Sequence, residues 1–189
     1  RQEDGQKVRA EFGISPSTLV VGIVGRLQPQ KDHETFLRAA RTIRDALPEV
    51  RFLVVGDGPL RDELTAQAQT LDLLPSVIFC GIRKDIPAVL AALDLLVFSS
   101  RWEGLPVALM EGMAAGKPIV STDVGGVGDV AVAAGALGSG GGCTVRVAAA
   151  ASASASALGA PGNRSSVKPR PNKSSVVYSK SCLTKLHTF

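Results

Sequence analysis

The sequence is poor in cysteine, in aromatic residues and in long apolar runs. Its three cysteines, Cys80, Cys143 and Cys182, are odd in number and form no C-x-x-C pair, so neither a disulfide framework nor a zinc site is indicated. No apolar run reaches the ~18 residues that span a bilayer, and no charged segment followed by an apolar one indicates secretion. We therefore expect a cytoplasmic protein, since a reducing compartment suits unpaired thiols.

Acidic residues are missing from the C-terminal tail. Residues 131–189 carry seven lysines and arginines and no acid, whereas residues 1–130 carry 14 basic against 17 acidic residues. The overall charge of +4 therefore comes from the tail. A nucleic-acid-binding surface would add stacking aromatics or a basic helical stripe to such cations, and the tail has only Tyr178 and Phe189. We expect no nucleic-acid partner.

Short β-branched runs alternate with helix-like segments between residues 18 and 130. Strands are expected at 18–24, 51–55, 77–81, 95–98 and 119–121, and helices at 32–47, 61–70, 86–93 and from residue 106. Nearly continuous apolar strands suit a parallel sheet that is covered on both faces. Because the alternation predicts right-handed βαβ crossovers, the expected fold class is α/β, a Rossmann-like parallel sheet with helices on both faces.

Composition divides the chain into three segments. Residues 1–17 are polar, with a short helix possible at 6–12, and are expected to form a linker leading into the domain at 18–130. Residues 131–189 contain a glycine-rich stretch, an Ala/Ser repeat and a Ser/Lys/Pro/Arg remainder. Such a composition buries too little apolar surface to offset its chain entropy, which predicts a disordered, low-complexity basic tail.

Two acids flank the start of the helix expected from Pro106. That helix is apolar on almost every side, which predicts burial all round, yet Glu111 sits in its middle and Glu103 lies in the loop before it. A buried polar group costs roughly 2 to 7 kcal/mol unless it is hydrogen-bonded. A ligand hydroxyl could supply that bond at a helix N-terminus whose free amides favour an anion. Pairing of Glu111 with a core cation and complementing of the helix dipole by Glu103 stay open as the alternative.

A loop with two cations follows the first expected strand. Arg26 and Lys31 lie between that strand and the next helix, at the strand end where open α/β sheets bind ligands. A solvated loop with incidental charges is the alternative. His33 follows at the helix start, where it could act as a general base, although we expect a surface or first-turn residue instead.

Both motifs resemble sequences of a known enzyme family. The string E-G-L-P-x-x-x-x-E at 103–111 resembles the E-x7-E element of retaining, nucleotide-sugar-dependent glycosyltransferases of the GT4 type, which have the two-lobed GT-B fold. The string G-R-L-x-x-x-K at 25–31 is similar to the loop with which these enzymes grip the donor diphosphate. The segment G-D-G-P-L at 56–60 and the segment T-D-V-G-G at 122–126 are also similar to the family. The resemblance ends near Val127.

The resemblance implies a role for each residue of the site. Glu111 would accept hydrogen bonds from the ribose, Glu103 would lie beside the donor sugar, and backbone groups at 81–83 would hold the nucleobase. The implied catalytic residues are Arg26, Lys31 and Glu103. The implied donor-binding residues are Gly25, Arg26, Lys31, Gly81, Ile82, Arg83, Glu103, Gly104, Leu105, Val107 and Glu111.

The expected function is retaining transfer of a hexosyl group from a nucleotide-diphosphate sugar to an acceptor, with this chain supplying the donor-binding half, one lobe of a GT-B enzyme. No metal and no cofactor are expected, because two fixed cations can stabilise the leaving diphosphate. Peripheral membrane association is expected only through the family's N-terminal lobe, which this sequence does not contain. Two alternatives stay open: a nucleotide-sugar-binding chain that catalyses no transfer, and a nucleotide-sugar epimerase of related fold.

Overall fold

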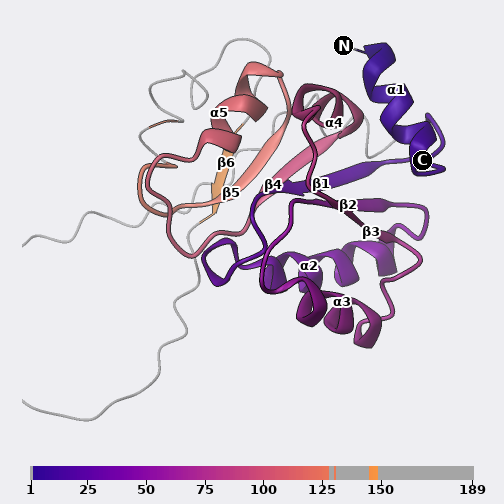
Figure 1. The fold of residues 1–189 in the computed structure, drawn as a ribbon, viewed down its shortest axis with the longest axis horizontal. Coiled ribbons are helices and arrows are strands. Elements are labelled where there is room, and N and C mark those ends of the chain that lie inside the picture. The colour runs from indigo at the N-terminus through magenta and orange to yellow at the C-terminus, as the bar shows by residue number, and fades with distance from the viewer. Residues whose placement is uncertain (1, 128–129, 131–144, 149–189) are drawn as a thin grey trace, which may run out of the picture. The chain divides into compact units, whose positions relative to one another are not determined.

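The computed structural model describes residues 2–127, 130 and 145–148. It contains a six-stranded sheet in the order β3-β2-β1-β4-β5-β6, in which every neighbouring pair of strands is parallel (Figure 1). The strands are β1 (Val20–Val24), β2 (Arg51–Val55), β3 (Val77–Gly81), β4 (Leu95–Phe98), β5 (Ile119–Thr122) and β6 (Val145–Ala148). Among these residues, no helix has the length and apolar character needed to cross a lipid bilayer.

Helices cover both faces of the sheet, as expected for a Rossmann-like fold. The helices α2 (His33–Ala46) and α3 (Arg61–Thr70) lie on one face, and α4 (Ile86–Ala92) and α5 (Val107–Ala114) lie on the other (Figure 1). The side chains of β1 pack into two hydrophobic cores, one on each face of the sheet. Val21 and Ile23 pack with Phe36 of α2, whereas Val20 and Val24 pack with residues of α4 and α5. Burial on both faces explains why the strand sequences are apolar at nearly every position.

The strand order places a switch point between β1 and β4. From β1 the chain builds outward through β2 and β3, then returns to the other side of β1 and builds outward through β4, β5 and β6. The loops that leave β1 and β4 therefore diverge to opposite faces, and open α/β sheets bind ligands in the crevice between such loops. Both sequence motifs lie on these two loops.

The N-terminal segment is a docked helix rather than a linker, which corrects one expectation. Helix α1 (Gln2–Glu11) begins earlier than the helix considered at 6–12, and it packs against α4 (Figure 1). The guanidinium of Arg9, which is 6% exposed, donates to the carbonyls of Ala92 at 2.9 Å and Thr18 at 2.7 Å and pairs with Asp94 at 2.8 Å. One buried cation thus ties α1 to the end of α4 and the start of β1.

The expected domain boundary at residue 130 is too early for one segment. Residues 145–148 form β6, which pairs with β5 in the register Ile119↔Val145 to Thr122↔Ala148. The prediction of disorder is therefore wrong for these four residues. The other residues of the expected tail lie outside the described residues. A short β-branched run, V-R-V, between glycine-rich and alanine-rich stretches was the signal for this strand.

Close packing of α1 on α4 generates a stability prediction. A Cβ added at Gly5 would lie 2.7 Å from the backbone carbon of Ala91 and 2.9 Å from the backbone nitrogen of Ala92. Gly5→Ala should therefore lower the free energy of unfolding by about 1–3 kcal/mol through overpacking, although helix propensity alone would raise it by about 1 kcal/mol. Chemical denaturation monitored by circular dichroism measures the change.

The matched control is Gln6→Ala, at the neighbouring exposed position of α1, which should stay within about 0.5 kcal/mol of the wild type. A Gly5→Ala protein more stable than the wild type would show that α1 is not held against α4 in this way.

Candidate functional site

The loop between β1 and α2 presents Lys31 through an unusual backbone path. A short 3-10 helix, η1 (Pro29–Lys31), leads to Asp32, which has left-handed angles (φ 48°, ψ 49°) and caps α2 by accepting from the Thr35 N–H at 3.3 Å. Left-handed geometry is uncommon outside glycine and is favoured at Asn and Asp. Burial raises the pKa of Asp32, but hydrogen bonds from Arg101 and Thr35 outweigh that effect and lower the pKa below its usual value.

Lys31 and Glu103, predicted from separate motifs, meet directly. Nζ of Lys31 lies 2.6 Å from Oε1 of Glu103, and the Glu103 side chain is only 5% exposed. The Ser100 hydroxyl donates to the same oxygen at 2.6 Å. A buried carboxylate is stable only when it is paired and hydrogen-bonded, and these two donors from different loops meet that condition.

Further bonds join the two loops along their length. The Arg101 N–H donates to the Gln30 carbonyl at 2.8 Å, and the Gln30 side chain donates to the Trp102 carbonyl at 3.0 Å. The Ser99 hydroxyl lies 3.0 Å and 2.9 Å from the carbonyl oxygens of Lys31 and Asp32. The loops after β1 and β4 therefore form one connected surface at the switch point.

Three glycines pack closely against the backbone of these two loops. A Cβ on Gly125, which has φ +54°, would lie 1.8 Å from the Glu103 carbonyl oxygen, and one on Gly126 would lie 2.7 Å from that of Gly104. On the other loop, a Cβ on Gly58 would lie 2.4 Å from the Leu27 carbonyl oxygen. The G-D-G-P-L and 122–126 segments thus act as backbone supports for the two loops, because only residues without side chains allow such close approach.

Arg26 and Glu111 are both exposed, and neither has a side-chain hydrogen bond or ion pair among the described residues. For Glu111 this overturns an expectation. In α5 only Leu109 and Gly112 are buried, so the helix is buried on one side rather than all round, and the argument from a buried carboxylate does not apply. Pairing of Glu111 with a core cation is likewise wrong.

The N-terminal end of α5 also differs in detail from the expectation. The Val107 N–H is not free, because it donates to the Leu105 carbonyl at 3.0 Å. The N–H groups of Gly104 and Leu105 have no hydrogen-bond partner among the residues that the structure describes. The side chains of Trp102, Leu105 and Val107 are 56%, 67% and 56% exposed, so apolar groups face solvent around the start of α5.

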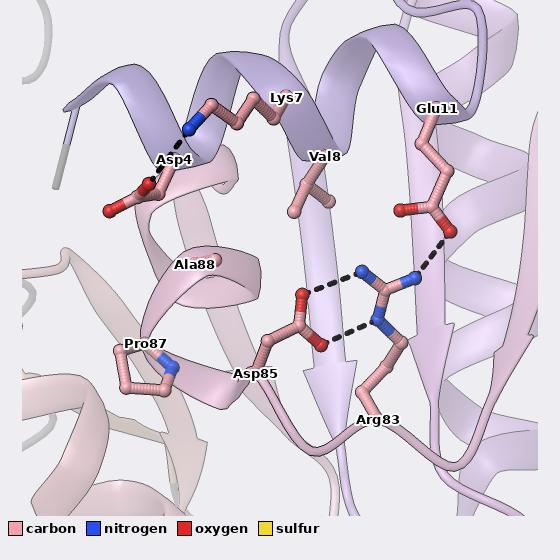
Figure 2. Close-up of a pocket in the computed structure, with 8 residues that line it drawn as sticks. All are labelled: Asp4, Lys7, Val8, Glu11, Arg83, Asp85, Pro87 and Ala88. Carbon is pink, nitrogen blue, oxygen red and sulfur yellow. Dashed lines mark hydrogen bonds and ion pairs between the residues drawn. The ribbon is translucent and has the colours of Figure 1, made fainter.

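The loop after β3 is held by hydrogen bonds of Arg83, including one to helix α1. Gly81 has φ +68°, and Ile82 is 76% exposed. On the loop after β1, a Cβ added to Gly25 would lie 3.6 Å from the Lys31 side chain, an ordinary contact distance. The Arg83 guanidinium is bonded to Asp85 on one side and to Glu11 of α1 on the other (Figure 2). These hydrogen bonds, with Asp85 contributing most, raise the pKa of Arg83 further above its already high usual value.

A hollow of about 480 Å³ lies between α1 and the start of α4, lined by these paired charges and by Pro87 and Ala88 (Figure 2). It does not include Arg26, Lys31 or Glu103. The Arg83 side chain is already paired there with Asp85 and Glu11, so it is not available to a ligand. No cluster of three or more potential metal ligands occurs in the described part of the chain.

His33 is the residue whose environment the sequence reasoning missed. It lies in the first turn of α2, as expected, but it is 1% exposed rather than on the surface, and both ring nitrogens are buried without a hydrogen-bond partner among the described residues. Burial, with a smaller contribution from the Lys31 charge, lowers its pKa to about 4. The buried positions of α2, His33, Phe36, Leu37 and Ala40, follow an i, i+3, i+4, i+7 pattern that places His33 on the core face.

The chain is similar in sequence to characterised transferases. The family described as Glycosyl transferases group 1 matches residues 18–158. The UDP-Gal:alpha-D-GlcNAc-diphosphoundecaprenol alpha-1,3-galactosyltransferase of Escherichia coli is 37% identical over 118 residues, 61% of this chain and 30% of that protein. The D-inositol 3-phosphate glycosyltransferase of Mycobacterium sp. (strain KMS) is 38% identical over 144 residues, 72% of this chain and 31% of that protein. The chain thus spans about a third of the length of these relatives.

Solved structures agree. Anabaena Alr3699/HepE in complex with UDP-glucose has a TM-score of 0.66 at 28% identity, covering 79% of this chain and 39% of that one. The C-terminal domain of a group 1 family protein (LpcC) from Francisella tularensis has a TM-score of 0.58 at 27% identity, covering 69% of this chain and 68% of that one. These similarities confirm the expected fold class, a Rossmann-like lobe of GT-B type.

The buried histidine predicts a pH dependence of stability. With a folded pKa of about 4 against 6.5 for the free side chain, the unfolded chain binds a proton that the folded chain does not between these pH values. Stability from this group is therefore complete above about pH 6.5 and is lost as the pH falls to about 4, by roughly 3 kcal/mol in total. His33→Leu should not show this loss, and it removes no hydrogen bond that the ring makes within the described part of the chain.

Urea denaturation of both proteins at several pH values tests the prediction, because carboxylates common to both cancel in the difference. The stability of His33→Leu relative to the wild type should rise as the pH is lowered. Parallel pH profiles for the two proteins would contradict it.

Proposed function

The chain belongs to the group 1 glycosyl transferase family, and on that basis we propose that it supplies the donor-binding half of an enzyme that transfers a hexosyl group from a nucleotide sugar. The observation that carries the proposal is the meeting of Lys31 and Glu103 at 2.6 Å, from the loops that follow β1 and β4. A cation for phosphate and a carboxylate for sugar hydroxyls are thus side by side at the switch point of the sheet. The solved relative with UDP-glucose supports this class of ligand.

The two cations are suited to the diphosphate. Breaking the anomeric C–O bond leaves negative charge on the nucleotide, so fixed positive groups aimed there stabilise the transition state more than the ground state. Arg26 is exposed and has no partner among the described residues, so its planar guanidinium is available to bind phosphate oxygens in a bidentate manner. Lys31 adds a point charge whose position is fixed by Glu103. These groups support a metal-independent mechanism.

Other parts of the donor would meet α5 and the loop after β3. The N–H groups of Gly104 and Leu105, which have no partner in the described ranges, are suited to the diphosphate or the sugar. The exposed carboxylate of Glu111, in α5, is suited to ribose hydroxyls. The backbone of Gly81 and Ile82 is assigned to the nucleobase. Arg83 holds this loop through its two acids rather than by contact with the donor.

We also propose that transfer retains the anomeric configuration. The acceptor oxygen forms its bond to the anomeric carbon on the face from which the phosphate departs, and the leaving phosphate oxygen takes the acceptor proton. The arrangement of Glu103 supports this route, because its Oε1 already accepts from Lys31 and Ser100, so that oxygen is not free to take the acceptor proton. Anomeric analysis of the product by NMR would reveal retention or inversion.

A ligand panel tests the proposed function directly. Thermal unfolding is measured with UDP, GDP and ADP and with their conjugates of common hexoses, since a ligand at a hundred times its dissociation constant stabilises the folded state by about 2.7 kcal/mol. One nucleotide series should raise the melting temperature, and its sugar conjugate should raise it further. No shift with any of these ligands would refute the proposal.

One observation favours the alternative of donor binding without transfer. The side chains of Arg26, Leu105 and Glu111 are exposed, whereas transfer to an acceptor rather than to water needs a site from which water is excluded. Sugar release in an assay of the 189-residue chain discriminates between the two. Acceptor-dependent release that is abolished in Glu111→Ala supports transfer, and binding without release supports the alternative.

The assignment of Arg26 predicts a selective loss of affinity. Arg26→Ala should weaken binding of a nucleoside diphosphate by about 10- to 100-fold, the value of a charge-assisted hydrogen bond, and should change nucleoside binding less than about twofold. Calorimetry with the nucleotide chosen from the panel measures both.

Arg38→Ala is the matched control, since Arg38 is an exposed cation on α2 that pairs with Glu34 and its loss changes the net charge equally. If Arg26→Ala lowered the affinities for the nucleoside and for the nucleoside diphosphate equally, a diphosphate contact would be ruled out.

A further inference from the structure

The two oxygens of the Glu103 carboxylate have different surroundings. Oε1 accepts from both Lys31 and Ser100 at 2.6 Å, whereas Oε2 has no hydrogen bond to any residue in the described ranges. Within those ranges, the only side-chain nitrogen or oxygen atoms that are both buried and without a partner belong to His33. Oε2 has no partner there and is not one of them, so it is not fully buried. It is therefore the oxygen of this carboxylate that a bound molecule can approach.

Ser100 is the more rigid of the two partners of Oε1. It is the second residue after the end of β4, it is 3% exposed, and its carbonyl accepts from the hydroxyl of Thr122, the last residue of β5, at 2.7 Å. Lys31 reaches Glu103 on a flexible four-carbon stem. The orientation of the carboxylate is therefore set by the Ser100 hydroxyl, whose position follows from two strands of the sheet.

We propose that Ser100 is a positioning residue that fixes Oε1 of Glu103 and thereby directs Oε2 toward a hydroxyl of the donor sugar. This inference rests on the proposed function and adds a residue that the sequence motifs did not indicate. It also means that the Lys31–Glu103 pair persists when the donor binds. Because an ammonium group has three N–H donors, Lys31 can keep its bond to Oε1 and still donate to the diphosphate.

Loss of the Ser100 hydroxyl should affect the sugar and the nucleotide differently. The terminal torsion of a glutamate is broad, so without Ser100 the carboxylate is held by the flexible lysine alone and Oε2 is no longer aimed. Affinity for the nucleotide sugar should fall by about tenfold. Affinity for the nucleoside diphosphate, which does not contact Oε2, should change by less than about threefold.

The experiment compares these two affinities by calorimetry, using the nucleoside diphosphate and hexose conjugate that stabilise the wild type most. Ser100→Ala removes the hydroxyl, and Ser100→Cys keeps a group of similar size with a weak donor, so a folded variant remains if alanine leaves a cavity. Ser121→Ala is the control, because Ser121 is 1% exposed and its hydroxyl donates to the Thr122 carbonyl at 3.0 Å without touching Glu103. It should change neither affinity.

The same measurement in a Glu103→Gln background completes a double-mutant cycle. If Ser100 acts through the carboxylate, Ser100→Ala should cause little further loss of sugar selectivity there. The inference would be overturned if the Ser100 variants lost affinity equally for both ligands, or if both variants kept the wild-type preference for the nucleotide sugar. Either result would leave the proposed function intact. A wild-type chain that binds neither ligand would overturn the proposed function itself, and the inference with it.

Discussion

A buried carboxylate needs a partner of opposite charge, and in this protein the partner comes from a loop on the other side of the switch point. Glu103 lies in the loop after β4 and Lys31 in the loop after β1, and their ion pair spans the two loops because these strands are neighbours in the sheet. Breaking such a pair by removing one member is far more costly than the pair is stabilising. The pair therefore selects the arrangement in which both loops present their polar groups at one edge of the sheet.

Residues that hold the site are separated from residues that would touch a ligand. Ser99 and Ser100 are buried and already bonded, whereas Arg26, Glu111 and the apolar side chains around α5 are exposed. A rigid layer thus lies beneath a layer of available groups. This division is what preorganised binding requires, because little side-chain freedom remains to be lost in the supporting layer when a ligand arrives.

The sequence predicted strands β1 to β5 and helices α2 to α5 to within about two residues, because parallel strands covered on both faces carry nearly unbroken apolar runs. It missed β6. It failed where the deciding contact was distant along the chain. Residues 1–17 read as a linker because the partners of Gly5 and Arg9 lie in α4 and at Asp94. Helix α5 was expected to be buried all round because its composition is apolar, but only one side meets the sheet. The pairing of Lys31 with Glu103 followed from neither spacing nor composition, whereas the helical pattern of α2 did contain the burial of His33.

Arg9 has a consequence for anyone who trims the protein. The family match begins at residue 18, so a truncation at that residue would remove α1 and with it the guanidinium of Arg9. The carbonyls of Thr18 and Ala92 and the carboxylate of Asp94 would then lose a shared donor, and the side of α4 that α1 covers would face water. A shortened version of this lobe that behaves well in solution would have to keep the N-terminal helix, whatever the extent of sequence similarity suggests.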